Sequence, residues 1–330
     1  MKIFLTGANG FIGRHLTRHL AAAGHEILAL VRTEADCDFP ASVQTVRGEL
    51  SATDPWRKAL AGCDALIHLA ARYRIGGIDR REMAASNIEG TRRVLHAAEQ
   101  AGLKRIVHVS STAALGETFG QLEDETHRHN GCFRSFYEQT KHVAHGIAEA
   151  AQRRGVPLMI AIPGGVFGPG DGSDLAQALS QFAQGKLPAQ VASASRFQLC
   201  PVDALCDGLR RVVEQGECGR NYLLTGQTVG MEQLISLAAK VCNRPVPRKI
   251  SPEQLRWPAR LCDALRPLGL RLPLSREALQ VMDGSTYLYS SARAKAELGW
   301  PWQEICSTFD ARFEDYVRHI NDLSGARVRT

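Results

Sequence analysis

Residues 6–13 read TGANGFIG and place three glycines, Gly7, Gly10 and Gly13, at three-residue spacing. A short apolar run at residues 2–5 precedes them, and an opening helical pattern at residues 11–16 follows. In such a strand–turn–helix unit, glycines permit a tight turn, a close approach of the backbone to a pyrophosphate, and close packing of helix on strand. The helix N-terminus adds unpaired N–H groups that favour an anion. The stretch therefore predicts a dinucleotide-binding turn, with a purely structural glycine turn as the alternative.

Strand and helix patterns alternate through the first half of the chain. Six apolar runs predict strands at Ile3–Thr6, Glu26–Val31, Val43–Val46, Ala65–Leu69, Arg105–Val109 and Leu158–Ile162. Helices are predicted between them at Phe11–Ala23, Asp54–Ala61, Arg80–Ala101 and Ser135–Arg154. This alternation predicts an α/β fold of the Rossmann type, a doubly wound parallel sheet with helices on both faces.

The pattern loosens from about Pro169 into loops and short helices. We therefore expect a dinucleotide-binding domain over residues 1–168. Residues 169–330 are expected to form a smaller, partly helical region that mainly binds substrate and returns some segments to the core. Within it, Trp257–Leu274 is apolar but broken by charges and prolines, which predicts an amphipathic lid or interface segment.

Composition and charge exclude several classes of protein. The net charge of +6 is scattered over 330 residues without a basic stripe, which argues against a nucleic-acid partner. No apolar run is long enough to span a membrane, and the start of the chain has no secretory pattern, so a cytoplasmic location is expected.

No metal site is expected either. Nine cysteines, an odd number without CxxC spacing, fit reduced thiols better than a disulfide framework or a zinc site. A set of four side chains in the segment that precedes the fourth predicted helix resembles a group of metal ligands. We interpret this segment as a solvated loop. The four residues are Asp124, Glu125, His127 and His129.

The ends of two predicted strands carry further cofactor signals. An acidic residue after the second strand would bind the adenosine ribose, whereas a basic one accepts a 2′-phosphate. Arg32 stands there and favours NADP(H) over NAD(H), with a solvated surface arginine as the alternative. The fourth strand ends in Leu69, Ala70 and Ala71, a candidate wall for the cofactor. His68, inside that strand, is expected to be a core histidine and not a catalytic one.

A third set of residues carries acid–base chemistry. The strand at 105–109 runs into three hydroxyl residues, of which Ser111 is the second. Tyr137 and Lys141 are four residues apart and share one face of the next helix. A nearby ammonium is expected to lower the pKa of Tyr137, so that it exchanges a proton with a carbonyl or alcohol as hydride moves. A strand-end hydroxyl would hold the substrate oxygen.

Together, the TGxxGxxG turn, the Ser-Ser strand end and the YxxxK pair resemble the short-chain dehydrogenase/reductase superfamily. The motifs HLAA at 68–71, NIEGT at 87–91 and IPGGVFGPGD at 162–171 are similar to its extended branch. That branch includes NAD-dependent epimerase/dehydratases, dihydroflavonol-4-reductase-like enzymes and 3β-hydroxysteroid dehydrogenases. The resemblance covers most of the chain and is strongest up to residue 171.

The resemblance implies a role for each matching residue. Tyr137 would be the general acid/base, Lys141 would bind the nicotinamide ribose and tune Tyr137, and Ser111 would orient the substrate. Asn87 corresponds to a structural asparagine of the family, and a homodimer through the central helices is usual in it. The implied cofactor contacts are Gly7, Gly10, Phe11, Ile12 and Gly13 at the pyrophosphate, Glu49 and Leu50 at the adenine, and Pro163 and Val166 at the nicotinamide.

Departures from the family pattern bear on the substrate. Leu115 stands where a tyrosine often precedes the glycine, and Gly164-Gly165 stand where nucleotide-sugar members tend to carry an asparagine. Residues 195–197 are Ser-Arg-Phe, where nucleotide-sugar members tend to carry Arg-Asp-Phe. The chain therefore offers few polar side chains to bind a nucleoside diphosphate.

The expected function is therefore NADP(H)-dependent reduction of a ketone or aldehyde, or the reverse oxidation. A nucleotide-sugar epimerase or dehydratase with tightly held cofactor uses the same tyrosine and lysine and stays open as an alternative. A non-catalytic dinucleotide-binding sensor or scaffold is the third possibility, although such proteins commonly lack one of the two residues.

Overall fold

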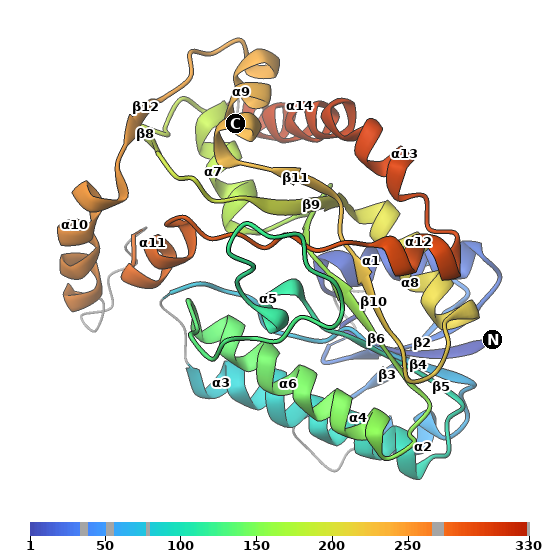
Figure 1. Cartoon of the computed structure of the whole chain (residues 1–330). Coiled ribbons are helices and arrows are strands. Elements are labelled where there is room, and N and C mark those ends of the chain that lie inside the picture. Colours follow the sequence, from blue (N-terminus) through green and yellow to red (C-terminus); the bar gives the residue numbers. More distant parts are fainter. Residues whose placement is uncertain (34–38, 51–55, 77–79, 266–273, 329–330) are drawn as a thin grey trace.

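The computed structural model describes residues 1–33, 39–50, 56–76, 80–265 and 274–328. A seven-stranded sheet with the order β10-β6-β5-β4-β1-β2-β3 forms its centre (Figure 1). Every neighbouring pair in this sheet is parallel, which confirms the predicted fold class. Its strands are β1 (Lys2–Thr6), β2 (Glu26–Val31), β3 (Val43–Arg47), β4 (Ala65–His68), β5 (Arg105–Val109), β6 (Leu158–Pro163) and β10 (Asn221–Leu224). The six predicted strands are present to within one residue at either end.

Two layers of helices cover the sheet because successive side chains of each strand point to opposite faces. Ile3 and Leu5 pack in one hydrophobic cluster with α1 (Phe11–Ala22), α8 (Val202–Gln215) and α12 (Ala292–Leu298). Phe4, between them, packs in a second cluster with α2 (Trp56–Leu60), α4 (Gly90–Gln100) and α6 (Phe136–Arg153). The predicted start of the second helix, Asp54, lies outside the described residues.

The helix predicted over Arg80–Ala101 is divided into three parts, so the prediction of one continuous α-helix is wrong. It consists of α3 (Arg80–Ala84), one π-helical turn η1 (Ala85–Glu89) and α4. Asn87 lies in η1, and its side-chain amide bonds both backbone groups of Arg72, at 2.7 and 2.9 Å, and the Thr140 hydroxyl of α6 at 3.0 Å. The wider turn thus carries an amide that joins the loop after β4 to α6, in agreement with the structural role expected for Asn87.

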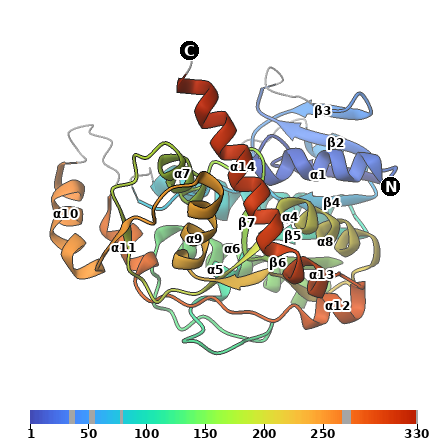
Figure 2. The same ribbon diagram turned by 90° about the horizontal axis from the view of Figure 1, so that it is seen from above.

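The C-terminal half adds a third hydrophobic cluster. The helices that carry it lie together beside the main sheet (Figure 2). Phe167, Phe309, Phe313 and Tyr316 form the aromatic centre of this cluster, with ring centroids 5.4–6.0 Å apart. A three-stranded sheet of β7 (Gly165–Phe167), β9 (Phe197–Pro201) and β11 (Gln227–Val229) packs with α7 (Asp174–Ala183), α9 (Met231–Cys242) and α14 (Phe309–Val328). The remaining elements are α5 (Thr112–Leu115), β8 (Ala189–Val191), β12 (Arg248–Ile250), α10 (Pro252–Leu265), α11 (Arg276–Met282) and α13 (Trp302–Ser307).

The C-terminal half also contributes to the main sheet. β10 pairs with β6, with Asn221 opposite Ile160, and α8 covers the face on which α1 lies. The sequence pattern predicted neither as a specific element, and the domain boundary at residue 168 stays a prediction. Within the part of the chain that the structure describes, no helix has the length and apolarity to cross a membrane.

The segment predicted to be a lid or interface is partly described. Its first residues form most of α10, where the exposed fractions of Trp257 and Leu261 are 76% and 61%. Residues 266–273 of that segment lie outside the described residues. Its role stays a prediction.

Candidate active site

The strand order reverses between β1 and β4, and the carboxyl ends of these strands border a crevice in which such sheets bind ligands. Thr6 ends β1, and its hydroxyl accepts a hydrogen bond from the N–H of Ala70 at 3.2 Å. The N–H of Leu69 bonds the Thr6 carbonyl at 3.3 Å, and Ala71 is exposed beyond them. The predicted cofactor wall 69–71 therefore lies directly beside the glycine turn.

The glycine turn has no room for side chains. Gly7 has φ +80°, and a Cβ there would lie 2.7 Å from the backbone nitrogen of Ala70. A Cβ on Gly13 would lie 2.1 Å from the carbonyl oxygen of Gly7. Helix α1 starts after Gly10 with no side-chain cap and no acidic residue in its first turn. Its first N–H groups are therefore available to an anion, so the turn fits a dinucleotide pyrophosphate.

His68 is buried in β4 and has polar partners on both ring nitrogens. They are the hydroxyls of Thr6 at 2.7 Å and Thr91 at 3.1 Å. Burial lowers the pKa of His68 to about 3. The prediction of a core histidine is confirmed.

Three predicted cofactor residues, those expected at the adenosine, lie where β2 and β3 terminate side by side. Arg32 follows β2 directly and is exposed. Glu49 is also exposed and Leu50 is half-buried, two and three residues after β3. The register pairs Val31 with Arg47, so Arg32 and the start of the 48–50 segment share one edge of the sheet. Residues 34–38 and 51–55, which follow them, lie outside the described residues.

The nicotinamide-side residues lie where β6 continues into β7. Pro163 is buried as the last residue of β6, and Val166 packs as a half-buried side chain of β7. The Phe11 ring of α1 comes within 3.8 Å of the Cβ position on Gly168, and His15 bonds the Pro169 carbonyl at 2.8 Å. Helix α1 is thus hydrogen-bonded to the segment that follows β7.

Ser111, Tyr137 and Lys141 come together as the sequence spacing predicted. Ser111 caps α5 at the end of β5, and its hydroxyl forms a hydrogen bond with the Tyr137 side chain. Tyr137 lies in the first turn of α6. Lys141, one turn later and 3% exposed, donates a hydrogen bond from Nζ to the Val109 carbonyl at 2.9 Å.

The charges of this trio differ from the expectation. Burial raises the pKa of Tyr137 to about 12, and the hydrogen bond from Ser111 opposes this only in part. The predicted lowering of the tyrosine pKa is therefore wrong for this structure, because the cost of burying a phenolate dominates. Burial also lowers the pKa of Lys141 to about 8.

Tyr73 is a neighbour of the trio that the sequence analysis missed. Its ring meets the Tyr137 ring edge to face with centroids 4.8 Å apart, and half of its surface is exposed. Its position five residues beyond β4, at the ligand edge of the sheet, was the available signal.

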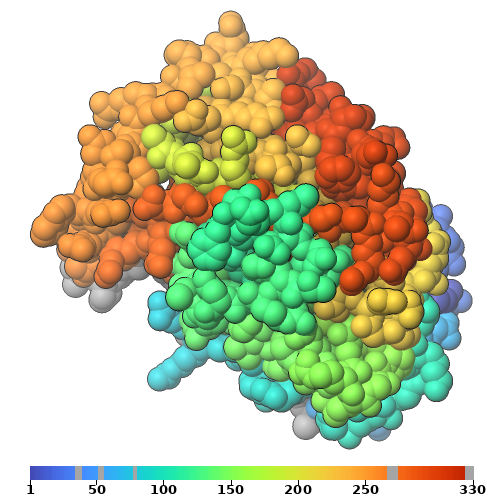
Figure 3. Space-filling model, viewed as in Figure 1, coloured from blue at the N-terminus to red at the C-terminus, as the bar shows by residue number. Residues whose placement is uncertain are grey.

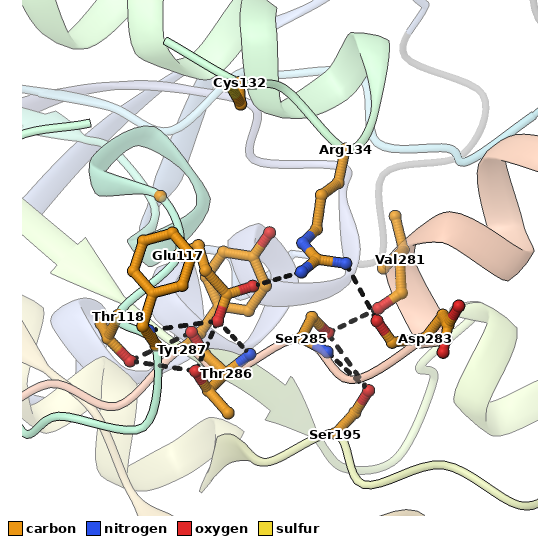
Figure 4. A network of polar contacts seen from close by, with 12 residues as sticks. Glu117, Thr118, Cys132, Arg134, Ser195, Val281, Asp283, Ser285, Thr286 and Tyr287 are labelled. Atoms are coloured by element: carbon orange, nitrogen blue, oxygen red, sulfur yellow. Dashed lines mark hydrogen bonds and ion pairs between the residues drawn. The ribbon is translucent and has the colours of Figure 1, made fainter. Parts of the chain in front are cut away.

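A polar network holds the start of α6 against the C-terminal segment (Figure 4). Glu117 accepts a hydrogen bond from the Thr286 N–H at 2.6 Å and pairs with Arg134 at 2.8 Å. Arg134 also donates to the carbonyls of Gln280 and Asp283, at 2.9 and 3.0 Å. On the front of the molecule, the green loop residues before α6 lie against the orange-to-red C-terminal residues (Figure 3). Segments far apart in the chain thereby fix the loop that precedes Tyr137.

The interpretation of residues 124–129 as a solvated loop is wrong for two of them. Glu125 is 5% exposed and accepts a hydrogen bond from the Leu223 N–H at 3.2 Å. The side chain of His129 is 1% exposed and pairs with Glu138 of α6 at 3.3 Å. Contacts with β10, which lies far away in the sequence, and with the following helix α6 bury these groups. Within the described ranges, no cluster of three or more His, Cys, Asp or Glu residues could hold a metal ion.

Comparisons with known proteins agree with this geometry. Residues 3–224 match the model of the NAD dependent epimerase/dehydratase family. A Synechocystis protein, provisionally described as a dihydroflavonol 4-reductase, is 28% identical over 92% of this chain and 90% of its own length. The 4-hydroxy-2-methyl-3-oxo-4-farnesyl-3,4-dihydroquinoline-1-oxide ketoreductase of Stigmatella aurantiaca is 29% identical over 91% and 92%. Among solved structures, the dTDP-glucose 4,6-dehydratase DesIV of Streptomyces venezuelae has a TM-score of 0.79 at 20% identity, covering 98% of both chains.

The fold and the glycine turn define a dinucleotide-binding protein of the Rossmann type. The chain belongs to the NAD-dependent epimerase/dehydratase family, the extended branch of the short-chain dehydrogenase/reductases. It is thus an NAD(P)-dependent oxidoreductase.

Proposed function

We propose that the protein reduces a ketone or aldehyde with NADPH, or oxidises the corresponding alcohol with NADP⁺. The observation that carries this proposal is the Ser111–Tyr137–Lys141 trio at the carboxyl edge of the sheet. The ketoreductase relative supports a carbonyl substrate, and Arg32 at the end of β2 supports a 2′-phosphate on the cofactor.

The cofactor, when bound, supplies or accepts a hydride at its nicotinamide ring. In the direction of reduction, the Ser111 hydroxyl holds the carbonyl oxygen and Tyr137 donates its phenolic proton to it. A pKa of about 12 keeps Tyr137 protonated at neutral pH, as a proton donor requires. Solvent then restores the proton to the phenolate, and the positive charge of Lys141 on the same helix face favours that transient anion.

The glycine turn with Phe11 and Ile12 would hold the pyrophosphate. Residues 69–71 would form one wall of the cofactor site, and Pro163 with Val166 would form the wall at the nicotinamide. Glu49 and Leu50 would flank the adenine. The cytoplasmic location and a homodimer through α4 and α6 belong to the same proposal.

NADPH consumption by the purified protein tests the proposal, with a panel of aldehydes, aryl ketones, dihydroflavonols and ketosteroids. Tyr137→Phe should lower kcat by roughly 10²- to 10⁴-fold while NADPH still binds. Tyr316→Phe is the matched control, since its hydroxyl bonds Asp171 in the C-terminal cluster. Arg32→Gln should raise the KM for NADPH roughly tenfold and leave that for NADH unchanged, as expected for a lost charged hydrogen bond.

Two outcomes would contradict the proposal. Turnover that survives in Tyr137→Phe would exclude the tyrosine as acid. If no compound of the panel causes NADPH consumption, but the protein interconverts nucleotide sugars with its retained cofactor, the epimerase alternative would be favoured.

A further inference from the structure

A pocket of about 430 Å³ opens beside the first turn of α6. Four parts of the chain form it: the loop after β4, helix α3, the start of α6 with the residues before it, and the pair α10 and α11. Two of its lining residues are chain neighbours of the proposed catalytic tyrosine or of its ring partner. Phe136 lines it and precedes Tyr137, and Arg74 lines it and follows Tyr73, whose ring contacts Tyr137.

The two acidic residues of this pocket already have partners. One oxygen of Glu277 accepts the Phe136 N–H at 2.5 Å, and the other accepts the Gly76 N–H at 3.0 Å. Asp263 accepts the backbone N–H of Arg276 at 3.1 Å. These carboxylates hold the walls of the pocket together through backbone groups.

Four arginines line the same pocket, and only one of them forms an ion pair within the described residues. Arg134 is held by Glu117 and by two backbone carbonyls, as described above. Arg74, Arg80 and Arg276 are exposed, and none of the three forms an ion pair within the described part of the chain. Burial raises the pKa of Asp174, and the positive charge of Arg74 opposes this rise, although no ion pair joins the two side chains. Four arginines face three carboxylates, those of Glu117, Asp263 and Glu277, so the pocket carries an excess of positive charge.

Apolar side chains line the remainder of the pocket. Met83 is 2% exposed, and Phe133 and Phe136 are half-buried. The Arg80 guanidinium lies 5.1 Å from the centre of the Phe136 ring, so an arginine and an apolar surface are combined at one spot. Guanidinium groups match the geometry of carboxylates and phosphates, and the apolar surface suits a hydrocarbon body.

We propose that this pocket binds the anionic end of the substrate. The substrate class is then a carbonyl compound with a carboxylate or phosphate group on an apolar body. The anion contacts Arg74, Arg80 and Arg276 while the carbonyl lies at Tyr137. This inference rests on the proposed reductase function and narrows its substrate class.

Matched ketones test the inference. The probes are 5-oxo-5-phenylpentanoate, its methyl ester, and the phosphonate of the same chain length. The wild-type protein should prefer an anionic probe to the ester by at least about tenfold in kcat/KM, chiefly through a lower KM. The carboxylate and phosphonate arms show which anion the pocket accepts.

Two arginine variants and one control locate the effect. Arg74→Gln and Arg276→Gln, combined, should bring the preference for the acid over the ester close to one, chiefly by raising the KM for the acid. Arg92→Gln on α4, an exposed arginine that is not part of the pocket lining, should retain the full preference. Equal kcat/KM for acid and ester in the wild type, or an unchanged preference in the double variant, would overturn the proposal.

A binding arm separates this inference from the reductase function. Titration calorimetry with NADP⁺ present should show the acid binding at least about tenfold more tightly than the ester, and this difference should be absent from the double variant. If no probe is reduced but this difference is found, the reductase assignment fails and the anion pocket stands. If the acid and the ester bind equally, the anion pocket fails whatever the turnover.

Discussion

The same substitution, glycine to alanine, is predicted to have opposite effects at two positions inside helices. In α6, Gly146 is exposed, and no atom lies within 4 Å of the Cβ that an alanine would add. Gly146→Ala should therefore raise the free energy of unfolding by about 0.5–1 kcal/mol, the gain in helix propensity. In α1, a Cβ on Gly13 would lie 2.1 Å from the Gly7 carbonyl oxygen and 2.8 Å from two backbone atoms of Ala8.

The clash at Gly13 decides the sign there. A contact of 2.1 Å falls about 0.9 Å short of the 3.0 Å below which real Cβ contacts essentially do not occur. The atoms met are backbone atoms, so no side-chain rotation can relieve the contact. The helix must move away from β1, at a cost of about 1–3 kcal/mol that exceeds the gain in propensity. Because the displaced backbone forms the pyrophosphate turn, NADPH affinity should fall roughly tenfold, or about 1.4 kcal/mol.

Urea unfolding and NADPH fluorescence titration of both variants measure these effects. Gly146→Ala should unfold at higher urea than the wild type and bind NADPH normally, whereas Gly13→Ala should lose on both counts. Gly13→Ala protein as stable as Gly146→Ala protein, with wild-type affinity for NADPH, would refute the close approach of α1 to the turn.

Three further predictions concern buried charges and amides. Burial lowers the pKa of Lys141 to about 8, so between that pH and about 10.4 the unfolded chain holds a proton that the folded protein has lost. As the pH rises through this range, the free energy of unfolding of the wild type should therefore increase by about 3 kcal/mol relative to that of Lys141→Met. Urea titrations at several pH values measure this difference, and parallel pH profiles of the two proteins would contradict the buried ammonium. Glu277→Gln retains one acceptor oxygen for two backbone donors, so the free energy of unfolding should fall by about 1–2 kcal/mol. Hydrogen exchange of the backbone amide of Phe136 or Gly76 should also become faster. The exposed Glu253→Gln in α10 serves as its control, and equal exchange in both variants would count against the contact. Asn87→Leu should cost about 2 kcal/mol in urea, because backbone groups of Arg72 lose their partners; an unchanged midpoint would rule out that role for the amide.

The main sheet and the proximity of Tyr137 to Lys141 could be predicted because their signals are local. The central parallel strands are buried on both faces and are therefore nearly continuous apolar runs, as in residues 27–31, whereas the edge strand β3 is only half-buried. The i, i+4 spacing of Tyr137 and Lys141 fixes them on one helix face whatever surrounds the helix. The carboxyl ends of parallel strands meet at one edge, which predicts a hydroxyl residue after β5 at the ligand edge of the sheet; the family resemblance singled out Ser111.

Tertiary contacts decided what the local pattern could not. The polar residues Glu125 and His129 suggest a solvated loop by composition, but partners on β10 and α6 bury them, at sequence distances of 98 and 9 residues. The π-helical turn at Asn87 depends on backbone groups of Arg72 and on Thr140, which no helical periodicity encodes.

The electrostatics of the site followed the same division. The sequence determined that Tyr137 has a lysine one turn away, but the pKa of Tyr137 depends on how much water its phenol loses on folding, and that is a property of the packed structure. The pocket lined by four arginines likewise exists only because helices α3 and α11 meet the loop that follows β4. Sequence determined which groups are near one another along the chain. Folding alone determined which of them share a desolvated space, because burial and contact sum over segments that are distant in sequence.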